Sequence, residues 1–364
     1  MAIVICSSTL SGCIANQDSA DSVEEFPLAS LLDIHRTLWN HDLETDDIQS
    51  FAINITTWQM DHGGWGKNSF DSYNYPWDGQ QHISPYFNGG NYLGTFDNNA
   101  TTSEIRLLAE AFHSSRDIEF RTLISESIQL GIDFILESQF PSGAWPQVYP
   151  ERVINGGNYS NFATFNDHVM TRVMILIWDI IEGRQPFSGE ITQGLDMEGL
   201  NSSLNKGIDF ILKSQIVVDG KPTIWCQQHH PHSLVPMHGR PYELPSKASL
   251  ESTGIVSILL NWPYRDSEVV NSTWGAVDWF IENSVPDRRY EKKTGNFSES
   301  PGSLMWFRFH NLSDEQYFMS GRDSVKVYNI GELTDEMRTG YWWAGDWGMP
   351  IIIATSNIDI SERF

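Results

Sequence analysis

Two copies of one nine-residue stretch, Gly131-Ile-Asp-Phe-Ile-Leu-Glu-Ser-Gln139 and Gly207-Ile-Asp-Phe-Ile-Leu-Lys-Ser-Gln215, indicate how this 364-residue chain is organised. Each copy has the apolar spacing of a helix and ends in a glutamine, and a tryptophan follows soon after. A third, less similar copy runs from Gln59 to Trp65. The three glutamines are 80 and then 76 residues apart, and a period of that length predicts a repeated helical hairpin rather than a short solenoid unit.

The rest of the chain favours a mostly α-helical protein with small β decorations. Residues 66–100 are rich in Asn, Gly, Pro, Asp and Tyr, which predicts a long irregular loop of the kind that is usually functional. Short runs of strand formers occur at 216–218, 317–319 and 325–328. Helical spacing predicts helices over residues 29–39, 47–60, 105–112, 118–139, 164–181, 204–215, 250–260 and 272–283.

Charge and composition restrict the class of partner. The formal net charge is −24, so the chain has no general excess of basic groups with which to neutralise nucleic-acid phosphates. Aromatic residues make up 12% of the chain, and aromatic-rich clefts suit sugars, although a packed aromatic core explains most of these residues equally well. An anionic substrate stays possible only if identifiable Arg and Lys residues make one cleft locally cationic.

The N-terminus resembles an export signal. Leu10-Ser-Gly-Cys13 is similar to a bacterial lipobox, in which the cysteine is lipidated after cleavage, although the basic region that should precede it is missing. We therefore predict a truncated lipoprotein-type leader and linker over residues 1–28, a lipid anchor at Cys13, and an exported protein at the cell surface, in the periplasm or secreted. Only Cys226 follows the leader, so no disulfide can form within the mature chain.

Two acidic motifs precede predicted helices. Asp97-Asn-Asn-Ala-Thr101 and Thr164-Phe-Asn-Asp167 each offer a carboxylate with neighbouring polar oxygens, as Ca²⁺ prefers. Turn formation and helix capping explain both motifs equally well, and Thr101-Thr-Ser-Glu104 is itself a capping-box pattern. If the two motifs share one rim of the repeat, the carboxylates of Asp97 and Asp167 should meet.

Arginines, histidines and a lysine provide the candidate cations. Lys67 follows Trp65 in a glycine-flanked turn, which could present a cation beside a stacking face, although a helix end with a packed indole is the simpler interpretation. Arg240 lies in a Gly/Pro-flanked loop after a histidine cluster that fits no standard zinc spacing. Arg308 and Arg322 stand near aromatic residues, an arrangement that suits carboxylated sugars but also occurs on ordinary protein surfaces.

Taken together, these motifs resemble one family, the polysaccharide lyase family 10 pectate lyases. The resemblance covers roughly residues 30–345. The motifs that carry it, in order, are Gly63-Gly-Trp…Lys-Asn68, Asp97-Asn…Ala-Thr, Gly143…Trp-Pro-Gln147, Thr164-Phe-Asn-Asp167, Trp225-Cys…Gln-His229, Arg240…Tyr-Glu243, Glu251-Ser and Ser320-Gly-Arg-Asp323. The chain departs from the family pattern at Gly66, where proline is usual, at His168 and His230, where acidic residues are usual, and at Pro241, which crowds Arg240.

The resemblance implies a fold, a reaction and a set of site residues. The implied fold is an (α/α) toroid of repeated helical hairpins, here a single domain over residues 29–364. The implied activity is Ca²⁺-assisted anti β-elimination of polygalacturonate, which leaves 4,5-unsaturated oligogalacturonides, by a monomer. Arg240 would be the catalytic base, and Asp97 and Asp167 would hold the metal. The substrate-binding residues would be Trp65, Lys67, Asn68, Asp97, His229, Arg308 and Arg322.

Three alternatives stay open at this point. The chain could be a lyase for another uronate polymer, or a toroidal glycoside hydrolase that uses Asp97 and Asp167 as its two carboxyl groups. It could also be a non-catalytic glycan-binding lipoprotein whose aromatic residues form the site. A hydrolase would release saturated products and tolerate chelators, and a binding protein would show no turnover.

Overall fold

A computed structural model describes residues 27–36, 48–67, 70–153 and 158–358. The predicted leader lies almost wholly outside these residues, and so do Cys13 and Asn68. The chain forms two compact units, and it passes between them four times. The N-terminal unit contains residues 34–214 and 228–237, and the C-terminal unit contains the described residues among 1–33, 215–227 and 238–364.

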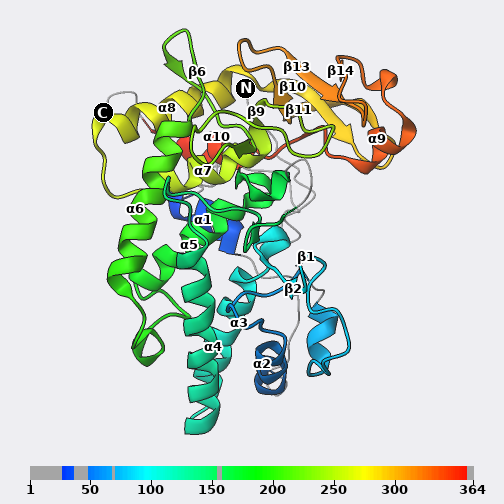
Figure 1. Cartoon of the computed structure of the whole chain (residues 1–364). Coiled ribbons are helices and arrows are strands. Elements are labelled where there is room, and N and C mark those ends of the chain that lie inside the picture. The colour runs from blue at the N-terminus through cyan, green and yellow to red at the C-terminus, as the bar shows by residue number, and fades with distance from the viewer. Residues whose placement is uncertain (1–26, 37–47, 68–69, 154–157, 359–364) are drawn as a thin grey trace, which may run out of the picture. The chain divides into compact units, whose positions relative to one another are not determined.

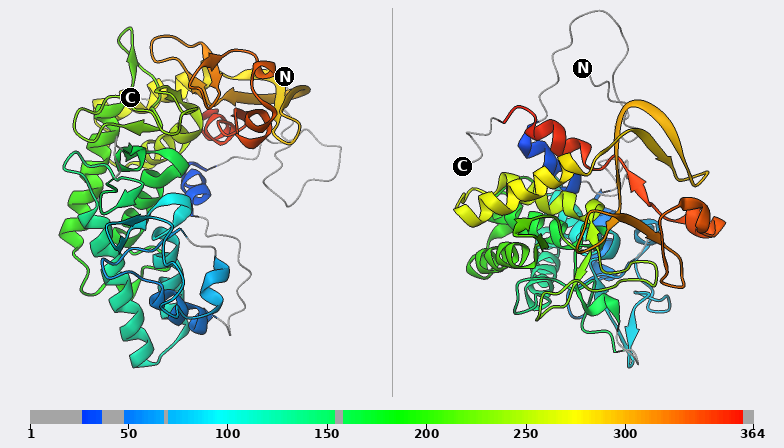
Figure 2. Two further views of the ribbon diagram at one scale, coloured as in Figure 1. Left: turned by 45° about the vertical axis from the view of Figure 1, so that its right-hand side comes forward. Right: turned by 90° about the horizontal axis from the view of Figure 1, so that it is seen from above.

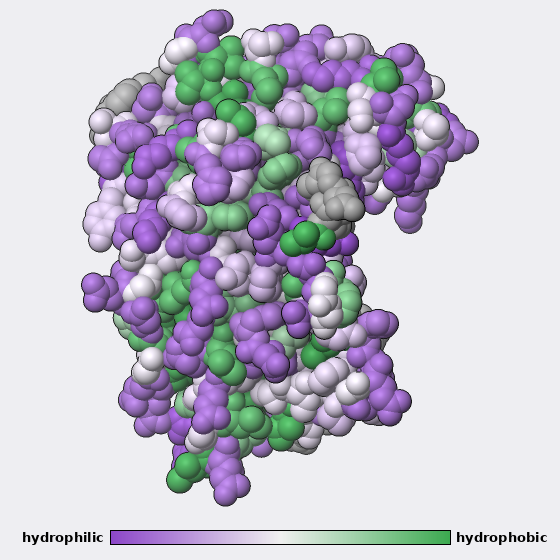
Figure 3. All heavy atoms as spheres, in the orientation of Figure 1, coloured by the Kyte–Doolittle hydropathy of each residue, from purple (hydrophilic) through white to green (hydrophobic). Residues whose placement is uncertain are grey.

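The N-terminal unit is built from two rows of helices (Figure 1). In one row α2 (Ile48–Thr57), α4 (Ile118–Glu137) and α6 (Met197–Ser214) are neighbours, and in the other α3 (Thr102–Ser114) lies beside α5 (Val169–Ile181). Most residues of α3 and α5 are buried, so these two are the inner helices. The face of α4 shown in Figure 3 mixes polar and apolar side chains, as expected of a helix that covers a core.

Short strands and turns connect the helices of this unit. Three antiparallel pairs of two-residue strands hold the connections, β1 with β2, β3 with β4 and β5 with β8. Helix α1 (Leu28–Arg36) ends at Arg36, which joins Arg106 of α3 in binding the buried Asp179 of α5. The short elements are η1 (Phe70–Asn74), β1 (Phe87–Asn88), β2 (Asn91–Tyr92), β3 (Gly94–Thr95), η2 (Asp97–Asn99), β4 (Val148–Tyr149), η3 (Tyr159–Asn161), β5 (Ala163–Thr164), η4 (Asn166–His168), η5 (Gly189–Thr192) and β8 (Gln228–His229).

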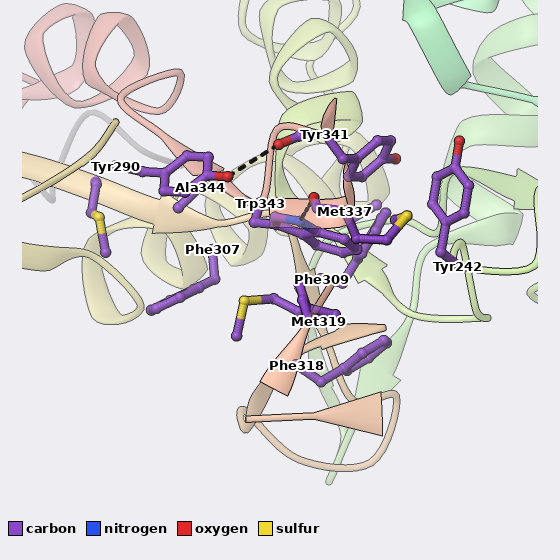
Figure 4. Packing of buried hydrophobic residues seen from close by; sticks show 13 residues of the cluster. Tyr242, Tyr290, Phe307, Phe309, Phe318, Met319, Met337, Tyr341, Trp343 and Ala344 are labelled. Carbon is purple, nitrogen blue, oxygen red and sulfur yellow. Dashed lines mark hydrogen bonds between the residues drawn. The ribbon is translucent and has the colours of Figure 1, made fainter. Parts of the chain in front are cut away.

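The C-terminal unit combines helices with larger sheets. Helices α7 (Ser249–Asn261), α8 (Ser267–Glu282) and α10 (Met349–Thr355) pack on one another, and β10 (Val285–Glu291) and β11 (Asn296–Phe307) form the long antiparallel hairpin visible in Figure 2. An aromatic core that includes Phe307, Phe309 and Trp343 lies beside these strands (Figure 4). The remaining elements are β6 (Val217–Val218), β7 (Lys221–Pro222), β9 (Lys247–Ala248), β12 (Phe309–His310), β13 (Tyr317–Ser320), β14 (Lys326–Val327), η6 (Ile330–Glu332), α9 (Asp335–Gly340) and β15 (Ala344–Gly345).

The three repeated glutamines make the same pair of hydrogen bonds. In each, the side-chain amide donates to a carbonyl of the turn that follows and to a serine carbonyl of a later helix. Gln59 Nε2 bonds the carbonyls of Gly63 and Ser127 (2.7 and 2.9 Å). The corresponding pairs are Gly143 and Ser203 for Gln139 (2.8 and 2.9 Å), and Thr223 and Ser272 for Gln215 (2.7 and 2.9 Å). Gln59 and Gln139 therefore fasten the end of one helix to the next helix of the row, and Gln215 makes the equivalent pair of bonds within the C-terminal unit.

The tryptophan turns are also repeated. Trp65 and Trp145 each donate their indole N–H to the isoleucine carbonyl ten residues earlier, Ile55 and Ile135. The turn glycines must approach the next helix closely, because a Cβ at Gly63 or at Gly143 would lie 2.0 Å from a helix carbonyl oxygen. Both glycines also have positive φ, +88° and +102°, which other residues adopt only with strain.

The predicted (α/α) toroid is wrong. About 46% of the described residues are helical and 16% are in strands, in several small sheets, which is not a closed ring of helices. The repeat does continue as helical hairpins through α2 to α8, but residues 284–345 form mainly strands, with only η6 and the short α9, rather than another hairpin pair. No apolar alternation marks β10 and β11 in the sequence, because Pro286, Gly295, Pro301 and several charged residues interrupt it. Among the described residues, no helix has the length and hydropathy needed to cross a membrane.

The glutamine bridges predict a stability effect. Replacing Gln139 by Ala would leave the carbonyls of Gly143 and Ser203 without a donor, at a cost of about 1–3 kcal/mol in the free energy of unfolding. Gln129→Ala is the matched control, because its amide bonds only Asp133 within the same helix. Urea denaturation monitored by tryptophan fluorescence measures both. Equal midpoints for the two variants would contradict a structural role for the bridge.

Candidate functional site

Two turns of the N-terminal unit have the same construction and bear the two predicted acids. After β3 the Asp97 backbone N–H donates to Thr95 Oγ1 (3.0 Å), and after β5 the Asn166 N–H donates to Thr164 Oγ1 (3.1 Å). The following residue is left-handed in both turns, with φ of 49° at Asn98 and 51° at Asp167. Asn and Asp adopt this conformation at the lowest cost after glycine, which accounts for the residue types there.

The capping box expected at Thr101 is wrong. No side chain caps α3, and Thr101 has a positive φ of 66°. Its hydroxyl instead accepts the Trp65 N–H (3.1 Å) and donates to the Thr95 carbonyl (2.9 Å). Thr101 therefore fastens the tryptophan turn to the strand that leads into Asp97.

The carboxyl groups of Asp97 and Asp167 meet, as predicted, although 70 residues separate them in the sequence. Lys67 Nζ lies 2.7 Å from Asp97 Oδ2, and the hydroxyl of Tyr86 donates to the same oxygen (3.0 Å). Burial favours the neutral acid, but the hydrogen bonds from Lys67 and Tyr86, with Asp167 also within hydrogen-bonding distance, hold the pKa of Asp97 below its usual value. The other oxygen, Oδ1, is buried and receives no donor from the described residues.

Sequence reasoning missed two residues of this cluster. Tyr86 lies in the long loop 66–100 and has no motif around it. Arg172, in the first turns of α5, donates to the Asp167 carbonyl (3.2 Å), while its Nε is buried without a partner among the described residues. Burial lowers the pKa of Arg172 to about 10 and the charge of Asp167 opposes that change. An arginine four or five residues after an acid at a helix start was the only available indication.

Other predicted residues of this unit are less accessible. Trp65 is fully buried, so its ring has no face to offer a sugar. His229 is also fully buried, with Nδ1 2.8 Å from the Leu234 carbonyl. The ring of His230 accepts the backbone N–H groups of His232 and Ser233. Among the described residues, no three His, Cys, Asp or Glu side chains converge as metal ligands.

In the C-terminal unit Arg240 is held by one acid. Its Nε donates to Glu243 Oε1 (2.8 Å), its backbone N–H donates to Oε2 (2.7 Å), and Nη2 also bonds Oε1. The hydroxyl of Tyr341 donates to the same Oε1 (2.8 Å). Burial disfavours the arginine charge, but the Glu243 hydrogen bond and charge prevail and raise the pKa of Arg240 above its usual range.

The three predicted arginines gather around two tyrosines. The rings of Tyr242 and Tyr341 are 5.0 Å apart, and both belong to the aromatic core drawn in Figure 4. The Arg240 guanidinium lies 5.1 Å from the Tyr242 ring and 5.6 Å from the Tyr341 ring. Arg322 is 5.6 Å from Tyr242, and Arg308 is 4.6 Å from Tyr341.

Each of the predicted cations has an acidic partner. Arg308 pairs with the buried Glu251, and Arg322 pairs with the exposed Glu336 (2.6 Å). Lys67 and Arg240 pair with Asp97 and Glu243 as described. A substrate carboxylate would therefore share these cations with protein acids. The charge argument had instead suggested arginines and lysines whose charge is available to the substrate alone.

Comparison with known proteins identifies the family. The family model described as pectic acid lyase matches residues 59–352. The chain belongs to the pectic acid lyase family. None of the curated proteins matches the chain, but solved structures do. A family 10 polysaccharide lyase from Cellvibrio cellulosa is 31% identical with a TM-score of 0.77, over 92% of this chain and 96% of that one.

A second solved structure is an aspartate-to-alanine mutant of the family 10 polysaccharide lyase from Cellvibrio cellulosa, in complex with trigalacturonic acid. It is 30% identical to this chain with a TM-score of 0.77, over 93% of this chain and 98% of that one. Family membership makes this protein a pectate lyase of polysaccharide lyase family 10, as its motifs predicted. The site residues carry no assignment from these comparisons and are taken up below as a proposal.

A buried acid in the first turn of α3, Glu104, should affect the pH dependence of stability. Burial raises the pKa of Glu104 from 4.5 to about 7, although the Tyr73 hydroxyl donates to it (2.8 Å). Between these two values the folded state retains a proton that the unfolded state has lost, so stability should fall as pH rises from 4.5 to about 7 and then level off. The free energy of unfolding should fall by at most about 1.4 kcal/mol per pH unit in this range.

Glu104→Gln should abolish this part of the pH dependence, since glutamine mimics the neutral acid. Urea denaturation between pH 5 and pH 8 tests it, with the exposed Glu119→Gln as control. An unchanged slope in the Glu104 variant would show that this carboxyl group titrates at its ordinary pKa.

Proposed function

We propose that this pectate lyase cleaves polygalacturonate by Ca²⁺-assisted anti β-elimination and releases 4,5-unsaturated oligogalacturonides. The observation that most supports the proposal is the contact between Asp97 and Asp167, with one buried Asp97 oxygen that no described donor reaches. The complex of the Cellvibrio enzyme with trigalacturonic acid supports the same class of substrate.

The residues around Asp97 fit a hard cation. Two adjacent carboxyl groups repel each other when ionised, and carboxylate oxygens are the donors that Ca²⁺ prefers. Asp97 Oδ1 and the Asp167 carboxylate would hold the ion, and since no third acid joins them among the described residues, substrate oxygens and water would complete its shell. When bound, Ca²⁺ would stabilise the negative charge that develops on the uronate.

The hydrogen bonding and charge of this cluster are set by Lys67, Tyr86 and Arg172. Lys67 and Tyr86 occupy Asp97 Oδ2, which leaves Oδ1 for a ligand. Arg172 fixes the carbonyl of Asp167 and offsets its charge. With two acids balanced by two cations, the site can accept a uronate carboxylate without a large net repulsion.

Arg240 is proposed to remove the C5 proton. That hydrogen is α to the carboxylate, and after its removal the C4–O bond breaks to leave a C4=C5 double bond. Arginine is nearly always protonated, and Glu243 favours the protonated form further. The neutral base is therefore scarce, and its fraction rises about tenfold for each pH unit while the pH stays below its pKa. Arg308 and Arg322 would bind substrate carboxylates beside it.

The glycoside hydrolase alternative fits the same acids less well. A hydrolase needs its two carboxyl groups about 5 Å or more apart, to hold a sugar between them or a sugar and a water. The carboxyl groups of Asp97 and Asp167 lie within hydrogen-bonding distance. Uronate polymers other than polygalacturonate stay as an alternative substrate for the same elimination. Export, a lipid anchor at Cys13 and a monomeric state stay predictions.

The proposal is tested by the product. Incubation with polygalacturonate should give a steady rise in ultraviolet absorbance from the unsaturated uronate, and a Ca²⁺ chelator should stop it. Restoring Ca²⁺ should restore the rate. Saturated reducing ends without absorbance would mean hydrolysis, and a chelator-resistant rate would remove Ca²⁺ from the mechanism.

Substitution of Arg240 tests its role. Arg240→Ala should lower kcat about 100-fold or more, as expected for loss of a catalytic base, while circular dichroism stays unchanged. Arg240→Lys should recover little activity, because lysine lacks the planar fork that fits Glu243. Near-normal turnover by a folded Arg240→Ala protein would refute the assignment.

The same base predicts a pH profile. Because the pKa of Arg240 is raised, log kcat of the native enzyme should climb with a slope near one across the alkaline range without a plateau. The residual activity of Arg240→Lys should level off, because the ordinary pKa of lysine is about 10.4. A flat profile from pH 7 to pH 10 in the native enzyme would exclude a titrating base with a raised pKa.

A further inference from the structure

One tyrosine hydroxyl contacts the acid that is paired with the proposed base. Tyr341 directly follows α9 and is buried in the aromatic core of Figure 4. Its hydroxyl donates to Glu243 Oε1 (2.8 Å), and Nε of Arg240 donates to the same oxygen (2.8 Å). One carboxylate oxygen therefore joins Tyr341 to Arg240, and all three residues belong to the C-terminal unit. The elimination proposed above gives Tyr341 no role.

The Glu243 carboxylate is stabilised by protein donors rather than by water. The residue is only 2% exposed, and burial by itself favours the neutral acid. The hydrogen bonds and charge of Arg240 nevertheless hold the pKa of Glu243 below its usual value. Oε1 accepts Nε and Nη2 of Arg240 and the Tyr341 hydroxyl, and Oε2 accepts the Arg240 backbone N–H. Glu243 therefore stays ionised and opposes the loss of the Arg240 proton.

The Tyr341 hydrogen bond acts in the opposite direction. When Arg240 gives up its proton, the charge of Glu243 is no longer compensated by a cation. A hydrogen bond to an uncompensated carboxylate is stronger than one to a carboxylate within an ion pair, so the hydroxyl stabilises this state more than the paired one. The proton of Arg240 is therefore easier to remove than it would be without the hydroxyl.

The hydroxyl keeps its own proton in alkaline solution. Burial raises the pKa of Tyr341 well above its usual value, although the charge of Arg308 opposes that change. The charges of Glu243 and Glu251 raise it further. Ionised, the tyrosine would raise the pKa of Arg240 by its negative charge. As a neutral phenol it acts on Arg240 through the Glu243 carboxylate instead.

The other groups around the cluster are one phenol and two ion pairs. Arginine and glutamate keep their charges between pH 7 and pH 10, so the ion pairs contribute a field that is constant over this range. The groups are Tyr242, whose ring lies 5.1 Å from the Arg240 guanidinium, Arg308 with Glu251, and Arg322 with Glu336. All of them stay the same in the variants compared below, so a change in pH dependence there comes from the Tyr341 hydroxyl.

We infer that Tyr341 is a positioning residue, which weakens the hold of Glu243 on the Arg240 proton through its hydrogen bond to Oε1. It acts through the carboxylate and transfers no proton itself. The inference rests on the function proposed above and deepens it, because Arg240 is there the base that removes the C5 proton. It also accounts for a buried acid beside that base, since Glu243 fixes the guanidinium while the phenol moderates the carboxylate charge.

The kinetic test removes the hydroxyl and keeps the ring. Tyr341→Phe should lower kcat on polygalacturonate about threefold to tenfold between pH 7 and pH 10, since less of the base is neutral, and should change KM less than twofold. Tyr290→Phe is the matched control, because it removes a buried hydroxyl of the same core that donates to the carbonyls of Arg338 and Tyr341. Its kcat should stay within about twofold of the native value.

A second readout follows the pKa of the base itself. In Arg240→Lys the base is an amine with an ordinary pKa of about 10.4, and NMR of isotopically labelled lysine side chains identifies it as the signal that the native protein lacks. Adding Tyr341→Phe should raise the titration midpoint of this signal by about half to one pH unit, whereas adding Tyr290→Phe should leave it in place. A ring-fluorinated tyrosine at position 341, whose hydroxyl is a stronger donor, should lower the midpoint.

Equal midpoints with and without the Tyr341 hydroxyl would overturn the inference, and so would a native kcat in Tyr341→Phe. If Tyr341→Phe did not fold, which circular dichroism would show, the fluorinated protein would decide alone, and an unshifted midpoint there would contradict the inference. If the native enzyme released no unsaturated product, the proposed function would fail instead. The NMR midpoint would still report whether the hydroxyl acts on the residue at position 240.

Discussion

The amide bridge of the repeated glutamines is the constraint on which the rest of the fold depends. One side chain at the end of a helix satisfies a carbonyl in the following turn and another in the next helix of the row. The bridge fixes the position of the turn relative to that next helix. The glycine in the turn permits contact with a helix carbonyl that no Cβ would allow. The turns that follow are consequently held in equivalent positions, and two of them present Asp97 and Asp167 to each other.

Charge pairing decides what these residues can do. The cations expected at the site all form ion pairs with protein acids, so their charges are already compensated within the protein. A substrate carboxylate joins these pairs rather than filling empty positions. The consequence differs between the two units, since Lys67 keeps Asp97 ionised for a cation, whereas Glu243 opposes the neutral form of Arg240 that proton removal needs.

The sequence predicted the helices and the meeting of the two acids because the cause is local and repeated. Helical spacing, glutamine and tryptophan turns recur every 76 to 80 residues, and equivalent turns occupy equivalent positions. The hairpin at 285–307 was not predictable in this way, because its strands are held by ring packing of Tyr290, Phe297 and Phe307 and not by alternation. Trp65 was misjudged as a ligand face since the motif gives residue type and not burial. Tyr86 was missed because only the folded chain brings it to Asp97, and Arg172 was missed because its spacing from Asp167 along the sequence is common in helices and indicates no particular role.

The central claim is that the carboxyl groups of Asp97 and Asp167 act together to hold the cation that the elimination needs. A double-variant cycle tests it most directly, with kcat on polygalacturonate measured for Asp97→Asn, Asp167→Asn and the protein with both changes. Groups that act as a unit lose activity non-additively, so the double variant should be about as slow as the slower single variant. Losses that multiply, or a folded single variant with nearly native kcat, would contradict the account.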